Sequence, residues 1–416
     1  MHISLDSALG RQRRLNSVGE SVLQIAPSAA AAYSLRSLTG GDPKVVRVRR
    51  SSNNGEQDFT AAGISSGALT SFVNEDVELF SNDFETNTDG FTLNTGGSNT
   101  AVRNTSDGFS GSGCLQLNLT SSSNSINTVK TDTYMQDTDG VSYTVSFYAK
   151  AVSGSANLVL KIGTTSSSSQ QISFSENGGE WVKHSLTFVN NLGAGAGNRN
   201  QRILFAGSTN NTTEWRIDDF QIVQTTSNGF VETWYDQSGN NNAVQATAGN
   251  QPKIVSAGSL LTAGVTFDGS DDHFDFTEIS NSGAFSLFIA SNITNNGGMV
   301  FGDNGGASNY VRYESANAVC KIANTEYDFG DSRDTSLDII NFNRDGSNSL
   351  SATRNSSAIG SPQTATGTFD INLIGVRNND VNPITGAIKE LLIYSSDQSS
   401  NRSAVEANIM TEYSIS

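Results

Sequence analysis

The segment TWYDQSGNNNAVQATAGNQPKIV occupies residues 233–255 of the chain. It places two large aromatic residues and an aspartate, Trp234, Tyr235 and Asp236, directly before a run of small and amide residues. This order indicates the end of a strand, with both rings buried, followed by a tight turn. The other interpretations are a catalytic site or a sugar clamp centred on Asp236.

The turn has a simple physical explanation. We expect the side chains of Asp236 and Ser238 to bond backbone amides and so close the turn, and Gly239 to permit the bend. On this interpretation the segment marks a structural corner, and an Asp236→Asn protein would unfold. If the Asp236→Asn protein folds but loses binding, the aspartate contacts a ligand.

The composition of the whole chain favours short strands joined by polar turns. Hydrophobic residues make up 36% of the 416 residues, and Gly contributes 40 residues against 5 Pro. The 21 Phe can supply packed cores, so the composition is not that of a disordered chain. The length suggests two or three domains. We therefore predict an all-β protein.

Residues 76–226 alternate between apolar and polar positions in short segments separated by polar turns. This pattern predicts a self-contained β-sandwich of the jelly-roll type. The strands are expected at residues 114–120, 142–151, 156–163, 170–175, 181–189, 201–207 and 214–223.

A second sandwich is predicted from residues 227–416, which show the same short segments of alternating apolar and polar residues separated by polar turns. Its strands are expected in GVTFDGSDDHFDF, FSLFIASNI, GGMVFGD, NYVRYES, LDIINFNRDG, DINLIGVR and AIKELLIYS. Residues 400–414 place Val405, Ile409 and Met410 at helical spacing and predict a short terminal helix.

The N-terminal region is less regular. KVVRVRR at 44–50 predicts a strand, and SGALTSFV at 66–73 predicts a short helix or turn. The alanines that follow Pro27 favour a short helix. Residues 1–32 have too little apolar content to fold alone, so we expect them to form an irregular or helical anchor that binds a partner.

The closing order of the second sandwich, GAIKELLIYS and then a helix, resembles the concanavalin A-like lectin/glucanase family in its laminin-G-like form. The YDQSG loop, together with AYSLRSLTGGDPKVVRVRRSSNNGEQDF at 32–59, resembles the catalytic domain of fungal-type α-L-arabinofuranosidase B. The same two motifs occur in phage virion proteins, where they lie close together.

Here about 150 residues separate SGALTSFV from NGFVETWYDQSG. We therefore predict that the first sandwich, residues 76–226, is inserted into a loop of the second. Residues 33–75 and 227–416 would form one discontinuous domain, since loops tolerate insertions.

The inserted region resembles carbohydrate-binding modules of the jelly-roll type in NDFET at 82–86, SYTVSFYAKA, GEWVKHSLTF and WRIDDFQIV. Such modules often hold a structural Ca²⁺ between their first and last strands, and the resemblance implies Glu85 and Asp219 as ligands. Carboxylate oxygens suit this hard cation. The alternative is that both acids cap turns.

Sugar binding requires exposed aromatic faces beside polar groups. The candidates in the inserted region are Trp181, Trp215, Tyr134 and Tyr148. The second sandwich offers only Asp271, Asp272, Asn309 and Tyr310 in expected loops.

Catalysis has weaker support in the sequence. A retaining glycosidase needs two carboxylates about 5–5.5 Å apart. Candidates are Asp236, Asp303, Glu314, Asp328 and Glu390, none of which stands in a recognisable catalytic motif. The three His residues are isolated, which argues against zinc. Cys114 and Cys320 are far apart and are expected to be buried free thiols.

The net charge and its distribution along the chain limit the classes of partner that we expect. The net charge is −16, and residues 1–50 carry eight basic against three acidic residues, which leaves −21 for the remainder. The acidic body argues against nucleic-acid binding. The basic N-terminal region either docks on an acidic protein or is a set of solvated arginines, and the sequence favours neither interpretation. The first residues contain no apolar run of signal-peptide length, and no stretch is long and apolar enough to insert into a membrane.

Together these features favour a phage virion protein, either a tail fibre, a receptor-binding subunit or a surface decoration. Residues 1–32 would bind other virion proteins, and the sandwiches would bind host surface polysaccharide. Many copies, for example a trimer by analogy with fibres, would supply avidity. The first alternative is an arabinofuranosidase-like glycosidase or depolymerase. The second is a purely structural decoration protein without a ligand.

Overall fold

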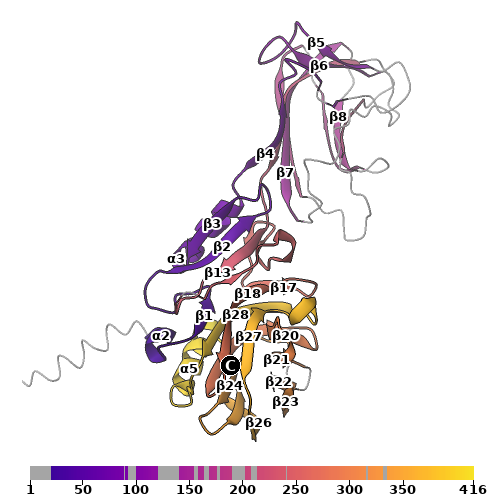
Figure 1. Cartoon of the computed structure of the whole chain (residues 1–416). Helices are drawn as coiled ribbons and strands as arrows, with labels where there is room; N and C mark the ends of the chain where they lie inside the picture. The colour runs from indigo at the N-terminus through magenta and orange to yellow at the C-terminus, as the bar shows by residue number, and fades with distance from the viewer. Residues whose placement is uncertain are drawn as a thin grey trace, which may run out of the picture. The chain divides into compact units, whose positions relative to one another are not determined.

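The structure is a computed structural model of the 416-residue chain. It describes residues 20–88, 90–91, 100–119, 140–153, 158–163, 168–175, 179–189, 202–207, 213–239, 241–314, 317–330 and 335–416. The chain divides into two units. Unit 1 comprises Met1–Phe72, Gly229–Val255 and Ser259–Ser416, and unit 2 comprises Val73–Asn228 and Ser256–Gly258. Each unit is built mainly from β-strands (Figure 1), as the all-β prediction requires.

Unit 2 is a sandwich of two antiparallel sheets. One sheet has the order β10-β7-β12-β6-β5, with β4 pairing to β12 beyond the end of β6, and the other has the order β11-β8-β9. The strands are β4 (Val77–Asn82), β5 (Thr100–Asn104), β6 (Cys114–Leu119), β7 (Ser142–Ser153), β8 (Leu158–Gly163), β9 (Ser168–Phe174), β10 (Val182–Val189), β11 (Arg202–Gly207) and β12 (Thr213–Gln224).

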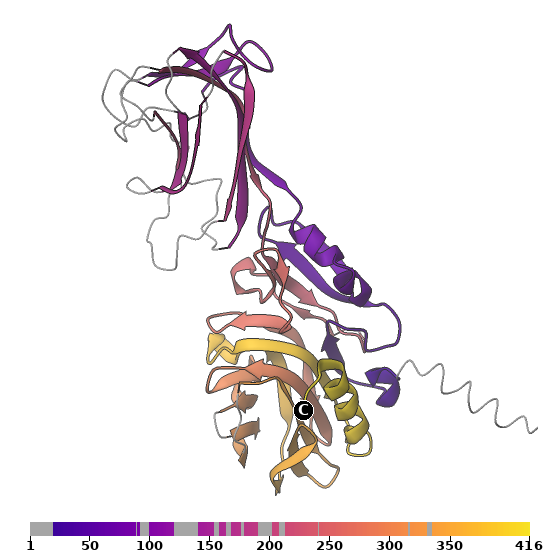
Figure 2. The same ribbon diagram turned by 180° about the vertical axis from the view of Figure 1, so that it is seen from behind.

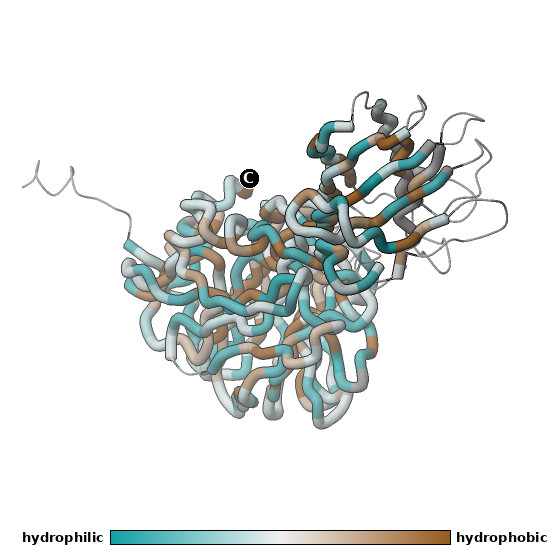
Figure 3. Tube along the Cα trace, turned by 90° about the horizontal axis from the view of Figure 1, so that it is seen from above, coloured by the Kyte–Doolittle hydropathy of each residue, from teal (hydrophilic) through white to brown (hydrophobic). Residues whose placement is uncertain are grey.

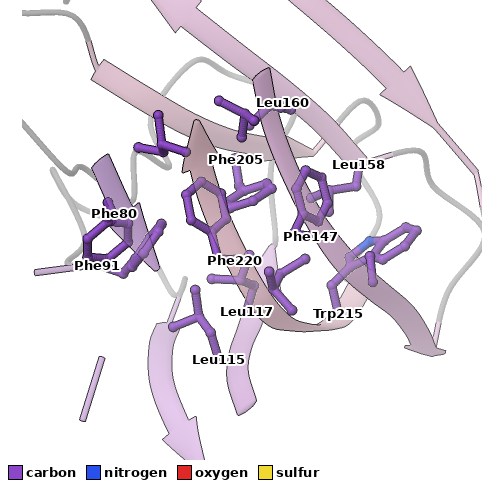
Figure 4. Close-up of a cluster of buried hydrophobic side chains, with 14 of the residues drawn as sticks. Phe80, Phe91, Leu115, Leu117, Phe147, Leu158, Leu160, Phe205, Trp215 and Phe220 are labelled. Atoms are coloured by element: carbon purple, nitrogen blue, oxygen red, sulfur yellow. The ribbon is translucent and has the colours of Figure 1, made fainter. Parts of the chain in front are cut away.

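The core of unit 2 lies between these two sheets. Strand β7 alternates strictly, with Tyr143, Val145, Phe147 and Ala149 buried and the residues between them partly exposed. Figure 4 shows Phe147 together with Phe205, Phe220 and Trp215 in one apolar cluster. Along the strands of this unit, hydrophobic and hydrophilic residues alternate (Figure 3). The alternation sends every second side chain inward and leaves the others on the outer face of the sheet.

Unit 1 is a larger sandwich in which β28 (Thr385–Tyr394) is the central strand. It pairs with β1 (Ala31–Ser34), β17 (Val265–Asp268) and β19 (Phe285–Ile293). The remaining strands are β2 (Lys44–Arg50), β3 (Glu56–Thr60), β13 (Gly229–Trp234), β14 (Ala243–Val244), β15 (Lys253–Ser256), β16 (Ser259–Leu260), β18 (Phe274–Asn281), β20 (Gly298–Asp303), β21 (Gly306–Tyr313), β22 (Asn317–Ile322), β23 (Thr325–Gly330), β24 (Asp338–Arg344), β25 (Ser349–Arg354), β26 (Ser357–Thr364) and β27 (Phe369–Ile374).

Helices occupy the margins of unit 1. They are α2 (Val22–Ile25), α3 (Ala61–Ser65), α4 (Ala68–Val73) and α5 (Arg402–Tyr413), with 3₁₀ turns at Ala248–Asn250 and Asn378–Asp380. Helices α4 and α5 agree with the short helices predicted at 66–73 and 400–414. Helix α5 packs beside α2, as Figures 1 and 2 show from opposite sides. Among the described residues, no helix has the length and apolar character needed to cross a bilayer.

The N-terminal prediction needs correction. The helix expected after Pro27 is instead strand β1, whose residues Ala31–Ser34 pair with β28. Val22, Ala26 and Ala32 are fully buried against the core of unit 1. Pairing with a buried strand outweighs the helix propensity of alanine, which is a weak preference. Residues 22–32 therefore belong to unit 1 and do not form a separate anchoring segment.

Candidate functional site

The outer face of the larger sheet in unit 2 carries aromatic and charged side chains. Tyr148 and Lys150 occupy the polar positions of β7, opposite the buried face. Lys183 of β10 lies directly across from Tyr148, and Arg216 of β12 lies across from Lys150. Trp181 immediately precedes β10. Because directly paired strand residues point to the same side, these groups share one face.

Three aromatic rings meet on this face. Phe109 stacks on Tyr148 with ring centroids 3.6 Å apart and planes 15° from parallel. Its centroid is 6.0 Å from that of Trp181 in an edge-on arrangement. Phe109 is 42% exposed, which is unusual for a phenylalanine. We call Phe109, Tyr148 and Trp181 the aromatic platform.

Lysine side chains border the aromatic platform. The Lys150 ammonium lies 5.1 Å from the Trp181 ring centroid, and the Lys183 ammonium lies 5.8 Å from that of Tyr148. Lys150 also forms an ion pair with Asp107, and Arg216 pairs with Glu214 and, at 3.6 Å, with Asp107. Lys150, the cation beside Trp181, is therefore paired with a neighbouring carboxylate, and so is Arg216.

A short loop, residues 107–113, presents Phe109. The backbone N–H groups of Phe109 and Ser110 donate to Oδ2 of Asp218 at 2.6 and 3.2 Å. Asp218 is fully buried, and burial raises the pKa of its carboxyl group above the ordinary value. The loop also closes on itself, since the N–H of Asp107 donates to the carbonyl of Ser112. The position of Phe109 is therefore set by a buried acceptor beneath the loop.

A polar cavity of about 620 Å³ borders Tyr148. Hydroxyl, amide and charged groups surround it, a mixture that can bond sugar hydroxyls. The lining residues are Ser81, Asn82, Asp83, Thr86, Asn87, Ser146, Tyr148, Lys183, Asp219, Phe220 and Gln221.

The structure places the four predicted sugar-binding residues in different environments or leaves them undescribed. Trp181 and Tyr148 share the outer face, as described above. Trp215 is fully buried in the core, opposite Ala151, so its prediction as a sugar contact is wrong. Tyr134 lies outside the described residues. Phe109 was not predicted, because it lies in a loop where no periodicity indicates which way a side chain points.

The predicted calcium ligands converge on the loop that carries Phe109. Glu85 accepts hydrogen bonds from the N–H of Gly113 at 2.6 Å and the hydroxyl of Ser112 at 3.2 Å. Asp219 accepts one from the hydroxyl of Ser110 at 2.7 Å. A Cβ atom at Gly111 would collide with Oε1 of Glu85, so the backbone approaches this carboxylate closely. These contacts are those of the alternative in which both acids cap turns. Carboxylate oxygens of this kind would also suit a hard cation such as Ca²⁺.

In unit 1, the YDQSG corner has a structural role. Asp236 accepts hydrogen bonds from the N–H groups of Ala32, Ser238 and Asn241 and from the hydroxyl of Ser238, at 2.7 to 3.2 Å. Trp234 is fully buried, and half-buried Tyr235 donates its hydroxyl to Asp58 at 2.7 Å. The predicted turn is thus present, and Asp236 also ties it to β1.

Other details of that prediction are wrong. Tyr235 is half-buried and not buried, and the Ser238 hydroxyl donates to the Asp236 carboxylate instead of bonding a backbone amide. Gly239 does not adopt a left-handed φ, and a Cβ there would meet only Oδ2 of Asp236, at 3.6 Å. The corner therefore does not require glycine at position 239.

Other candidate carboxylates of unit 1 also have defined partners. Glu390 is fully buried and accepts two hydrogen bonds from Arg36, at 2.7 and 3.0 Å, and one from the Tyr413 hydroxyl at 2.9 Å. Glu314 pairs with Arg312 at 2.7 Å. Asp303 and Asp328 accept hydrogen bonds from the N–H of Gly305 and the amide of Asn317, respectively.

Of the four residues named for loops of the second sandwich, Asp271 is half-buried and Asp272 is buried, whereas Asn309 and Tyr310 lie in strand β21 and not in a loop. Asp271 and Asp272 lie beside Asp268, with one carboxylate oxygen of each within 4.8 Å of the others. Burial, followed by the charge of Asp268, raises the pKa of Asp272 to about 7. Asn309 and Tyr310 are buried. The two cysteines are buried free thiols, as predicted.

Residues 78–197 match the family described as a carbohydrate binding domain. Unit 2 contains a carbohydrate-binding domain. The match spans the outer face with Tyr148 and Trp181, together with the loop that carries Phe109. No curated protein matches the chain.

Solved structures similar to the chain include carbohydrate-binding modules and a sialidase. The CBM22-1 xylan-binding domain of Paenibacillus barcinonensis Xyn10C is 18% identical, covering 37% of this chain and 97% of that chain, with a TM-score of 0.29. The tandem CBM22-1–CBM22-2 domain of the same protein is 12% identical, covering 77% and 98%, with a TM-score of 0.31. Trypanosoma rangeli sialidase is 14% identical, covering 43% and 31%, with a TM-score of 0.32.

Proposed function

We propose that this protein is a phage virion component that binds host surface polysaccharide through the carbohydrate-binding domain. The observation that carries the binding role is the pair Tyr148 and Trp181 on the outer sheet face, beside a polar cavity of about 620 Å³. Aromatic faces contact the C–H surfaces of sugars, and polar groups nearby bond the hydroxyls. The virion role rests on the YDQSG and N-terminal motifs of unit 1.

Two candidate carboxylates of unit 1 are already engaged in structural hydrogen bonds, which favours glycan binding over hydrolysis. Asp236 and Glu390, two of the candidates, are buried and accept three or more hydrogen bonds each from structural partners. A general acid or nucleophile must instead reach the substrate. We therefore propose a binding protein without glycosidase activity, attached to the particle through its N-terminal end and present in several copies.

The structure also supports a proposed structural calcium ion in the carbohydrate-binding domain. Glu85 and Asp219, together with the backbone of the loop that they contact, would hold it. When bound, the ion would neutralise the two carboxylates and link the first and last strands of the sandwich.

The binding role is tested on an array of bacterial capsular polysaccharides, lipopolysaccharides and plant oligosaccharides, probed with multivalent protein. We expect binding to a subset of the array, and a loss of about tenfold or more in affinity for Tyr148→Ala and Trp181→Ala. Val189→Ala, at the exposed end of β10, is the matched control. An array without hits would contradict the proposal, and release of sugar from any array polysaccharide would favour the glycosidase alternative.

A further inference from the structure

Part of the Tyr148 ring is already covered by its neighbours. Phe109 covers one face of Tyr148 at a centroid distance of 3.6 Å, and the ammonium group of Lys183 approaches the ring at 5.8 Å. The most exposed ring of the aromatic platform is Phe109 itself, at 42%. The residue that offers a stacking surface to solvent is thus one supplied by a loop rather than by a strand.

The loop that carries Phe109 is held in place from beneath. Asp218, fully buried, accepts the N–H groups of Phe109 and Ser110, while Glu85 accepts the N–H of Gly113. Asp107, at the start of the loop, is paired with Lys150 of β7. Because the backbone that carries this exposed Phe is already anchored, little further backbone ordering is needed when a ligand binds.

We propose that Phe109 is the primary stacking surface of the glycan site and that it selects pyranose rings with a flat C–H face. This inference rests on the proposed glycan-binding function and names the class of sugar that the same site takes. Phenylalanine has no polar group, and Lys150, the cation beside Trp181, is already paired with Asp107. Recognition at this position therefore depends on apolar ring contact rather than on charge. Pyranoses whose hydroxyls are equatorial present axial C–H groups to an aromatic face, and puckered furanose rings present a smaller one.

The test measures affinity of the full chain for gluco-, xylo- and mannohexaose and for arabinofuranose oligosaccharides by isothermal titration calorimetry. We expect the wild-type protein to bind at least one of the pyranose hexaoses. Phe109→Ala should weaken that binding by about tenfold or more, and Phe109→Trp should keep it. Because Phe109 is exposed, both variants should keep the wild-type melting temperature. The control is Val102→Ala, an exposed apolar residue (48%) on β5 of the same domain.

Each result has a distinct meaning. If Phe109→Ala binds the hexaoses as well as wild type, or better, Phe109 is not the stacking surface and the inference fails while the glycan-binding function stands. Binding of arabinofuranose oligosaccharides but no pyranose hexaose also overturns the inference alone. If the wild-type protein binds none of these probes and nothing on the polysaccharide array, both proposals fail.

Discussion

Two loops of this protein, one in each unit, rest on a buried aspartate. In unit 1, Asp236 accepts the backbone N–H groups of Ser238 and Asn241 and also that of Ala32 in β1. In the carbohydrate-binding domain, Asp218 accepts the N–H groups of Phe109 and Ser110. The polar chemistry is the same in both places. The difference lies in the neighbouring aromatic ring, which is buried at Trp234 and 42% exposed at Phe109.

This difference shows how to distinguish a structural corner from a binding loop. The Trp234 ring packs 5.8 Å from that of Tyr33 and 6.1 Å from that of Phe274, so its apolar surface already contributes to stability. Phe109 leaves part of its surface in water, which costs free energy unless a ligand covers it. An aspartate beside an aromatic residue is therefore not in itself a sign of a binding site.

The largest expected effect contrasts the two tryptophans of the carbohydrate-binding domain. Trp215→Ala should destabilise the domain by about 3–5 kcal/mol, because it removes a fully buried ring from the core. Trp181→Ala should change the free energy of unfolding by less than about 1 kcal/mol and should instead weaken glycan binding. Chemical denaturation followed by tryptophan fluorescence measures both. Equal destabilisation by the two variants would contradict the assignment of opposite faces.

The second prediction concerns the corner of unit 1. Asp236→Ala should destabilise this unit by about 3 kcal/mol, because three backbone N–H groups lose their acceptor. Asp236→Asn should cost less, since the amide oxygen still accepts. Differential scanning calorimetry would show the loss, with the exposed Asp275→Ala as control. A stable Asp236→Ala protein that had lost glycan binding would contradict the structural role assigned to this corner.

The third prediction concerns the calcium ion that we propose for the loop of the carbohydrate-binding domain. At a free Ca²⁺ concentration about 100-fold above the dissociation constant, binding should stabilise the domain by about 2.7 kcal/mol. Chelation should lower its melting temperature, and Glu85→Gln should abolish the response. Glu180→Gln, at an exposed acid of the same domain, should respond like wild type. An unchanged melting temperature on chelation would exclude the site.

The smallest expected effect comes from Asp272 in unit 1, whose pKa is raised from the ordinary value to about 7. Because the folded state favours the protonated form, this residue costs no stability below about pH 4. As the pH rises from about 4 through about 7, the folded state binds more protons than the unfolded state, so the unit loses stability. Asp272→Asn should therefore raise the melting temperature at pH 8 and leave it unchanged at pH 4. The exposed Asp275→Asn should not show this pH dependence.

Much of the site could have been predicted from strand periodicity. In WVKHSLTFV, Trp181 is in phase with Lys183 and Ser185, which indicates the polar face of β10. In EWRIDDFQIV, Trp215 is in phase with Ile217, which indicates the buried face of β12. The phase of the two strands therefore distinguishes the tryptophans, and it would have excluded Trp215 as a sugar-binding candidate.

The sequence by itself determined the all-β class, the main strands, the terminal helix and the aspartate-closed corner, because alternation and turn chemistry are local. Tertiary structure decided the rest. Ala31–Ser34 became a strand only because β28 offered a partner. Phe109 faces solvent only because Asp218, 109 residues away, holds its loop. Both outcomes depend on contacts between distant segments, and no local preference specifies such contacts.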